Sequence, residues 1–302
     1  MNASGHDEPI PYMQRTREYY RAIGYDTPYR WAHNDDAPFQ PLKKPLAQSR
    51  VTIITTAASF DPAKGDQGPG AKYNGGAKFF RVYAGDTSKE HDLRISHIAY
   101  DRMHTSAEDM NTWFPLSQLL RFAREGRIGE GAPNFFGLPT TRSQRATIET
   151  DAPELLARCK ADEVDAAIFV PNCPVCHQSV TLAARHLEAN GIPTVVMGCA
   201  KDIVEHVGAP RFLFSDFPLG NSAGKPFDLE SQRLTLELAL KLLESAFGPR
   251  TTMQSPLRWS GDPSWKRDYN NYERMPPEEL ARRRLEFDAQ KEAAKKQGEN
   301  AA

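Results

Sequence analysis

The sequence predicts an α/β fold, a parallel sheet with helices on both faces in layers like those of flavodoxin or Rossmann folds. The first observation is a regular alternation of short apolar segments with helical segments between residues 151 and 248. Strands that alternate with helices in this way imply right-handed crossovers and parallel pairing. The second observation is segment 51–59, which is β-branched and almost continuously apolar, as in strands covered on both faces.

The chain divides into three parts. Residues 1–50 are rich in aromatic residues and proline, so we expect an extended N-terminal arm with one helix near 14–23. Residues 51–248 carry the strand and helix pattern of an α/β catalytic domain. Residues 249–302 show no strand pattern, and we expect a C-terminal arm with a charged helix at 277–296 and a disordered end.

The central part predicts further elements in order. The expected strands are 79–85, 93–100, 134–140, 165–172, 193–198 and 210–217. The expected helices are 113–126, 153–161, 179–191, 200–208 and 231–248. The glycine-rich loop 65–76 is long and irregular, as binding loops and lids often are, so we expect it to close over the site. Asp109 and Asn111, which precede the first of these helices, are explained by capping.

Composition excludes several classes of protein. The 302 residues carry 38 Lys+Arg against 39 Asp+Glu, which gives no electrostatic footprint for nucleic acid. No apolar run approaches the roughly 20 residues that span a bilayer, and the first residues lack the pattern of a secretory signal. Four cysteines are too few for a disulfide scaffold. We therefore expect a cytoplasmic protein with reduced thiols and neither nucleic-acid nor membrane partners.

Two cysteines form a Cys-Pro-Val-Cys segment between a predicted strand and a predicted helix. Cys173 is expected at the carboxyl end of a parallel strand, where open α/β sheets bind ligands, and Cys176 in the first helical turn. A helix N-terminus lowers the pKa of a nearby thiol. The pair is therefore expected to be nucleophilic and redox-active. Pro174 suits the turn, as in the interior of thioredoxin-type dithiol motifs.

Other interpretations of this segment compete. A metal site could use Cys173, Cys176 and His177, with His97, Cys199 or water as the fourth ligand and zinc or iron as the ion. The order Cys-Pro-Val-Cys-His also matches the motif of c-type haem attachment. We exclude it because haem attachment needs export and the sequence shows no secretory signal. A buried pair without function is disfavoured, since buried cysteines normally scatter along apolar faces. Cys159, within a helical stripe, is expected to be such a core residue.

Candidate partners for the thiols come from three other segments. His97 lies near the end of predicted strand 93–100 and could act as a general acid or orient a substrate, although a structural histidine is an equal alternative. Asp101 follows it as a candidate substrate-binding residue. Segment 217–226 lacks the spacing of a phosphate loop. Its amides, including that of Gly220, could hold a carboxylate, with the side chains of Arg211 and Lys225 as anion partners.

Five segments in order make the chain resemble a known family. They are residues 37–59, 94–101, 108–129, the cysteine segment, and 189–226. This order resembles the B subunit of the glycine, sarcosine and betaine reductases and of D-proline reductase, the selenoprotein B family. The resemblance implies reductive cleavage of a carbon–nitrogen bond in a small amino acid or betaine. It also implies a selenocysteine three residues before the Cys-x-x-Cys, where this sequence has Val170, so it is a form that lacks selenocysteine.

We therefore expect a thiol-dependent oxidoreductase that cleaves a carbon–nitrogen or other carbon–heteroatom bond in a small polar substrate. Cys173 would attack, Cys176 would resolve the adduct as a disulfide, and His97 or His177 would protonate the leaving group. An external thioredoxin-like or other dithiol donor would then reduce the disulfide. The alternatives are a metal-dependent lyase or hydrolase, and a non-catalytic subunit of a reductase complex. A partner subunit or a homo-oligomer is expected.

Overall fold

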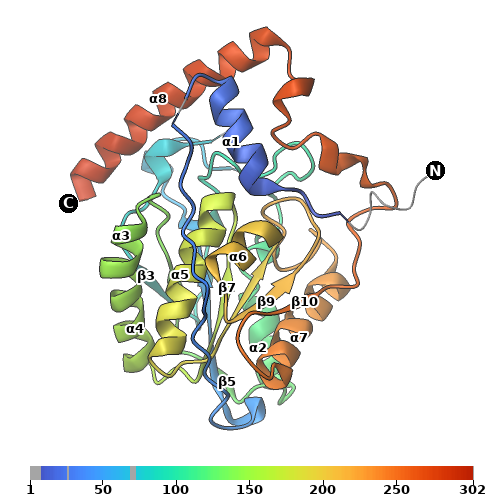
Figure 1. The fold of residues 1–302 in the computed structure, drawn as a ribbon. Helices are drawn as coiled ribbons and strands as arrows, with labels where there is room; N and C mark the ends of the chain where they lie inside the picture. The colour runs from blue at the N-terminus through green and yellow to red at the C-terminus, as the bar shows by residue number, and fades with distance from the viewer. Residues whose placement is uncertain (1–7, 26, 69–72, 302) are drawn as a thin grey trace.

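The computed structural model describes residues 8–25, 27–68 and 73–301. Within them, eight strands form one sheet in the order β10-β9-β8-β7-β1-β6-β3, with β5 paired to β1 (Figure 1). The strands are β1 (Arg50–Thr55), β3 (Tyr83–Asp86), β5 (Glu130–Gly131), β6 (Asn134–Gly137), β7 (Ala166–Val170), β8 (Thr194–Gly198), β9 (Arg211–Phe214) and β10 (Thr251–Gln254). Every pair is parallel except β3 with β6. The predicted α/β class is confirmed.

Helices cover both faces of the sheet, as the almost continuously apolar strands predict. Alternate residues of a strand point to opposite faces. Ile168 accordingly belongs to the hydrophobic cluster of one face, and Phe169 to that of the other. The first face packs against α2 (Leu116–Arg124) and α7 (Leu229–Ser245). The second packs against α4 (Ala152–Ala161), α5 (Pro174–Ala189) and α6 (Lys201–Val207).

Two predicted boundaries of the sheet are wrong. Of the expected strand 93–100, only β4 (Leu93–Arg94) forms, and it pairs antiparallel with β2 (Ala58–Ser59) outside the main sheet. The apolar alternation beyond Arg94 belongs to a loop whose side chains turn into the core. Strand β10 lies beyond residue 248, where no strand was expected. Its residues are polar except for Met253, and all are at least partly exposed, so their pairing with β9 at the sheet edge, rather than an apolar pattern, defines the strand.

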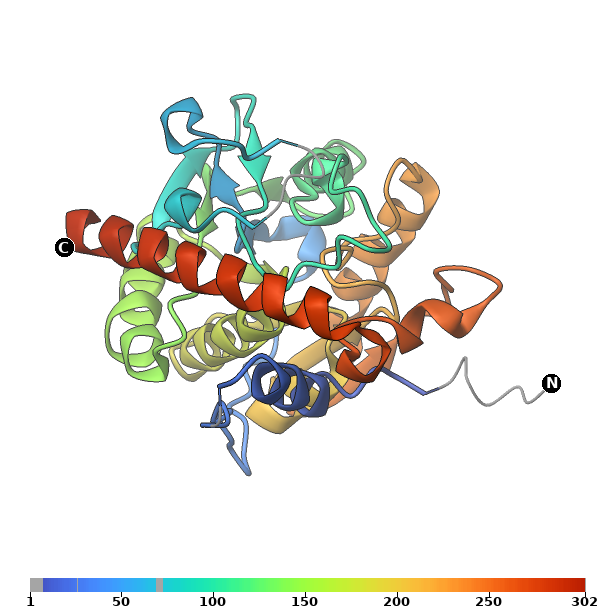
Figure 2. The same ribbon diagram turned by 90° about the horizontal axis from the view of Figure 1, so that it is seen from above.

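The N-terminal and C-terminal segments meet over one end of the domain. Helix α8 (Pro277–Ala301) crosses the top of the molecule beside α1 (Tyr12–Ala22), as both views show (Figures 1 and 2). Phe287 of α8 is buried in one cluster with Tyr19 and Ile23. The expected disordered end is wrong as far as Ala301, because α8 continues to that residue and Gly298 lies against the ring of Phe80.

The structure describes only part of the glycine-rich loop. Residues 69–72 of the expected lid lie outside the described residues. The described part, around the short helix η4 (Gly75–Ala77), lies against α8, where the Gly75 amide donates to Gln290 Oε1 at 2.7 Å. In the part of the chain that the structure describes, no helix is long and apolar enough to cross a membrane.

Candidate functional site

The two cysteines of the Cys-x-x-Cys lie at the point of the sheet where the order of the strands reverses. Strand β1 pairs with β6 on one side and with β7 on the other, and the chain continues outward on both sides. The carboxyl ends of β1 and β7 therefore border the crevice in which open α/β sheets bind ligands. The Asn172 amide donates to Thr56 Oγ1 at 2.9 Å, which ties the two strand ends together. Cys173 follows directly, as expected.

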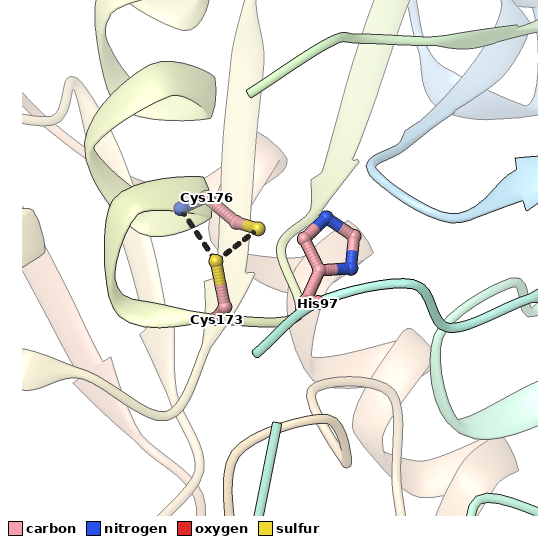
Figure 3. Close-up of side chains that lie close together, drawn as sticks. All are labelled: His97, Cys173 and Cys176. Carbon is pink, nitrogen blue, oxygen red and sulfur yellow. Dashed lines mark hydrogen bonds between the residues drawn. The ribbon is translucent and has the colours of Figure 1, made fainter. Parts of the chain in front are cut away.

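The sulfur atoms lie against each other at the start of α5. Cys173 is the N-cap, with an extended backbone, and its sulfur accepts the Cys176 backbone N–H at 3.3 Å, which replaces the usual serine or aspartate cap. Pro174 occupies the first helical turn, where its missing N–H costs nothing. The two Sγ atoms lie 2.6 Å apart (Figure 3). The backbone of Cys173 and Cys176 thus already holds the thiols at a separation from which a disulfide can form.

The protonation states of the two thiols are linked. Burial raises the pKa of Cys173, and the hydrogen bond and charge of Cys176 raise it further. Burial also opposes ionisation of Cys176, but the hydrogen bond from Cys173 and the charge and hydrogen bonding of His97 outweigh it, so the pKa of Cys176 falls well below its ordinary value. The pair therefore holds one thiolate and one thiol. Cys173 is 6% exposed and lines a cavity, whereas Cys176 is 0% exposed and lies behind it.

His97 lies beside the thiols, although not on a strand. Its ring, Cys173 and Cys176 place one ligand atom each within 4.8 Å of one another (Figure 3). The loop that carries it is held by Arg102, which donates to the His97 carbonyl at 2.6 Å. Its Nε2 lies 3.3 Å from the Thr140 hydroxyl, and its buried Nδ1 has no hydrogen-bond partner among the residues that the structure describes. A buried ring nitrogen without a partner is available to a substrate.

His177 cannot take the role that the sequence suggested. Its Nδ1 lies 2.7 Å from the Cys173 carbonyl, and its Nε2 accepts the Cys199 backbone N–H at 3.0 Å. The second bond requires an unprotonated Nε2, so Nδ1 carries the hydrogen. Burial lowers the pKa of His177 to about 4. With both nitrogens used and the ring neutral, His177 can neither protonate a leaving group nor bind a metal.

A cavity of about 790 Å³ opens in front of Cys173. Its walls combine the carboxyl edge of the sheet with the two terminal segments, since residues of α1, of the segment after α1, and of α8 all line it. Cavities of this size hold ligands larger than a free amino acid. The arms therefore build part of the site, which is larger than a small polar substrate requires.

The residues expected to bind substrate are mostly elsewhere. Asp101 lines the cavity, but its carboxylate lies 2.9 Å from His104 Nδ1 and also accepts two backbone amides. Gly220 and Lys225 do not line the cavity. Gly220 packs against the ring of Tyr100, and the backbone N–H of Lys225 donates to the Ser231 hydroxyl of α7. Arg211 was wrongly expected at the site. It is the first residue of β9 and so lies at the amino ends of the parallel strands, opposite to the site.

Arg211 has a structural role instead. It forms a fully buried ion pair with Glu188 at 2.6 Å and lies over the ring of Phe39. Carboxyl ends of parallel strands meet at one edge and amino ends at the other, so the first residue of β9 cannot reach the thiols. The prediction placed Arg211 by its strand without regard to which end of that strand it occupies.

Sequence reasoning missed three residues of the cavity wall. Thr140 and Arg142 follow β6, so the rule that ligands bind at carboxyl ends could have identified them. Lys78 follows the glycine-rich loop and carries no signal in the sequence. Burial and the charge of Arg142 lower the pKa of Lys78, and the charges of the two thiols oppose this shift.

The remaining cysteines and Val170 lie in the hydrophobic interior. Cys159 packs between α4 and the sheet, as predicted, and burial raises its pKa to about 12. Burial likewise raises the pKa of Cys199 to about 12, and its sulfur lies 3.9 Å from the Ser222 hydroxyl. Val170, at the position where the family resemblance implies selenocysteine, ends β7 and is fully buried in the core. The sulfur that faces the cavity is that of Cys173.

Comparison with known proteins gives two informative matches. The D-proline reductase subunit gamma of Acetoanaerobium sticklandii is 31% identical over 205 residues, which cover 67% of this chain and 81% of that protein. The betaine reductase complex component B subunit beta of Peptoclostridium acidaminophilum is 26% identical over 128 residues, 41% of this chain and 29% of that protein. No family profile matches the chain, and no solved structure matches it significantly.

The first match extends over most of the relative, and the second involves a component of a related reductase. Together they confirm the resemblance inferred from the ordered segments. The chain belongs to the glycine, betaine and D-proline reductase family.

Proposed function

We propose that this chain is a subunit of a reductase complex, in which it cleaves a carbon–nitrogen bond with the Cys173–Cys176 dithiol as reductant. The observation that carries the proposal is the contact of the two sulfurs, 2.6 Å apart, with one of them facing a large cavity at the switch point of the sheet. Membership of a reductase family supports the reaction class.

The first step forms a thioether. Cys173 gives its proton to the Cys176 thiolate, and its sulfur attacks the substrate carbon that bears nitrogen. The carbon–nitrogen bond breaks, its electron pair stays on nitrogen, and the protonated ring of His97 supplies the proton of the released amine. The required proximity is present, because His97 lies within 4.8 Å of both sulfurs.

The second step releases the reduced product. The Cys176 thiol gives its proton to the now neutral His97 ring, and its sulfur attacks that of Cys173, so a disulfide forms while the carbon–sulfur bond breaks. The electron pair stays on carbon, which then takes the proton that the His97 ring has just received. A carbonyl next to that carbon is needed to stabilise the developing negative charge. The substrate gains two electrons and two protons, the dithiol becomes a disulfide, and an external dithiol donor restores it.

A partner subunit is part of the proposal. One relative is called a subunit and the other a component of a complex. This chain supplies a dithiol and a cavity, and the partner would supply the remaining substrate contacts or the path for the dithiol donor.

A metal-dependent lyase or hydrolase is the second candidate, since His97, Cys173 and Cys176 could hold an ion. Two thiolates on one tetrahedral zinc, each at about 2.3 Å, stand about 3.8 Å apart. The sulfur separation of 2.6 Å is shorter than this and lies nearer to the roughly 2.05 Å of a disulfide than to the separation in a zinc site. This geometry favours the dithiol.

Trapping of thiols with mass detection tests the proposal. Reduced protein is incubated with D-proline, glycine betaine or N-phenylglycine, quenched with iodoacetamide, and the free thiols of each peptide are counted. We expect substrate-dependent loss of two thiols, at Cys173 and Cys176, in the wild type. Cys173→Ser should lose none, and Cys176→Ser should lose at most the Cys173 thiol, as a thioether that is not resolved. Cys199→Ser is the matched control and should behave as wild type. Undiminished turnover in both Cys173→Ser and Cys176→Ser would refute the mechanism.

A further inference from the structure

The cavity wall near the thiols carries two cations. Lys78 and Arg142 both line the cavity, and both interact electrostatically with Cys173. Among the residues that the structure describes, neither side chain forms an ion pair with a carboxylate. The guanidinium of Arg142 donates to the Tyr20 hydroxyl at 2.8 Å, which leaves further N–H groups available.

These two cations need a counter-charge. Burial lowers the pKa of Lys78, and the positive charge of Arg142 lowers it further, so the two groups repel each other across the cavity. The thiolate compensates only one of them. Like charges held together in a partly dehydrated crevice favour the binding of an anion between them. A guanidinium and an ammonium are together well suited to a carboxylate.

The backbone of Arg142 supports a role in binding. Its φ is +69°, a left-handed conformation that is unfavourable for a residue with a long side chain. Such strain persists where surrounding structure imposes it, and it is frequent at ligand sites. Here it aims the guanidinium toward the rings of Tyr20 and Phe287, at 5.5 Å and 5.6 Å from the ring centres, on the cavity wall.

The rest of the wall is aromatic. Rings from α1, from the segment that follows it, from the loop before β3 and from α8 line the cavity. They include those of Tyr20, Tyr25, Tyr29, Tyr73, Phe80 and Phe287. Aromatic rings around a cavity favour a flat apolar body, which can stack on them or meet their edges. D-proline and betaine, named in the relatives, would leave most of the 790 Å³ empty.

A phosphate is a poorer fit than a carboxylate. Phosphates in α/β folds are held by free amides at a helix N-terminus. At α5 the Cys176 amide already donates to the Cys173 sulfur, and the His177 amide to the Cys173 carbonyl. A singly charged group between two side-chain cations needs none of these amides.

We propose that the cavity binds an aromatic carboxylate that is larger than a free amino acid. Its carboxylate would lie between Lys78 and Arg142, and its ring against the aromatic side chains of the cavity wall. This inference rests on the proposed function, because it concerns the substrate of the same thiols. It places a planar apolar group beside the carbon that Cys173 attacks and makes Lys78 and Arg142 the residues that determine specificity.

Calorimetric titration of the reduced, full-length chain tests the ligand class. The probes are biphenyl-4-carboxylate, its neutral carboxamide, D-proline and glycine betaine. We expect the carboxylate to bind at least about tenfold more tightly than the carboxamide, which is the loss of one charge-assisted contact. D-proline and glycine betaine should bind more weakly than either aromatic probe. Equal affinity for carboxylate and carboxamide, or tighter binding of D-proline, overturns the inference.

Substitutions locate the anion. Lys78→Met and Arg142→Met keep much of the apolar stem and should each weaken biphenyl-4-carboxylate about tenfold while leaving the carboxamide unchanged. Lys64→Met is the matched control, since Lys64 lies in the same loop region, interacts with Asp61 and does not line the cavity. Bound carboxylate should also slow alkylation of Cys173. Unchanged affinity in both cavity variants overturns the assignment, and thermal melting verifies that each variant is folded.

Failure of this inference differs from failure of the proposed function. Cys173→Ser should abolish substrate-dependent thiol loss but retain biphenyl-4-carboxylate binding. If the carboxylate binds and the thiols never cycle, the proposed function fails while the ligand class stands. If the thiols cycle on D-proline and the aromatic carboxylate does not bind, the ligand class fails while the function stands.

Discussion

The Cys199 backbone N–H donates to Nε2 of His177 at 3.0 Å, so one buried ring joins the end of β8 to the first turn of α5. The same ring reaches the Cys173 carbonyl through Nδ1. His177 is therefore a positioning residue for the cysteine loop, and its neutral state is part of the folded structure.

This bond predicts a pH dependence of stability. Burial lowers the pKa of His177 to about 4, whereas an unfolded histidine titrates near 6.5. Between these values the unfolded chain binds more protons, so the free energy of unfolding should fall as the pH decreases from about 6.5 to 4. The difference corresponds to about 3 kcal/mol. Urea unfolding of wild type and His177→Gln should show that the variant is less stable at pH 7 but loses less on acidification. Parallel pH profiles would contradict this account.

A second prediction concerns Gly220. Its φ is +108°, and a Cβ atom there would lie 1.7 Å from the Tyr100 ring. Gly220→Ala combines backbone strain with a clash and should reduce the free energy of unfolding by about 2–4 kcal/mol. Gly248→Ala, with nothing within 4 Å of the added methyl group, is the control and should change it little. Thermal melts of the two variants make the comparison, and a neutral Gly220→Ala would disprove the packing argument.

A third prediction links His97 to thiol ionisation. The charge and hydrogen bonding of His97 help to lower the pKa of Cys176, against the effect of burial. His97→Gln should therefore move the thiolate absorbance transition near 240 nm to higher pH and slow alkylation at neutral pH several-fold. His91→Gln provides the comparison, because His91 Nε2 donates to the Asp86 carbonyl at 2.7 Å, where β3 pairs with the first residue of β6 and not with the end that borders the thiols. An unchanged transition in His97→Gln would remove His97 from the reactive group.

The buried pair Arg211–Glu188 gives a fourth prediction. Arg211→Met would leave the Glu188 carboxylate without its partner and should cost about 3–5 kcal/mol of stability. Lys201→Met, which removes a pair at the surface, should cost less than about 1 kcal/mol. Because Arg211 lies at the amino ends of the parallel strands and Cys173 at their carboxyl ends, the alkylation rate of Cys173 in folded Arg211→Met should equal that of wild type. A large change in that rate would place Arg211 at the site after all.

A fifth prediction tests whether α8 covers the cavity. Phe287 anchors α8 to Tyr19 and Ile23, whereas the neighbouring Leu285 is 72% exposed. Phe287→Ala should loosen the helix and increase the rate at which a bulky maleimide modifies Cys173, by several-fold. Leu285→Ala should leave the rate unchanged. If the two variants react alike, α8 does not control access to the thiols.

The sequence predicts the centre of the site better than its walls. The buried run that ends at Val170, followed by Cys173 and Cys176, predicts a strand, a short turn and a helix, all of which form, although the helix begins at Pro174 and not at residue 179. Local signals suffice there because three adjacent elements agree. Segment 95–100 misleads, since apolar residues that turn from a loop into the core alternate as those of a strand do.

The walls depend on contacts between distant segments, which no local pattern records. Lys78 and Arg142 belong to separate loops, and only the order of strands β1, β6 and β3 brings those loops to the thiols. The thin apolar stripe of α8 includes Phe287, but its partners on α1 are more than 260 residues earlier in the chain. Such pairings follow from topology and not from the character of either segment.

The covering of the cavity by α1 and α8 has a consequence for biosynthesis. Residues of the first helix and of the last both line it, so the thiol chamber is assembled from the two ends of the described chain. During translation the sheet and the dithiol emerge while α8 is still inside the ribosome. The dithiol is therefore synthesised before the helix that covers it, and we expect Cys173 to be more accessible to oxidants until α8 docks.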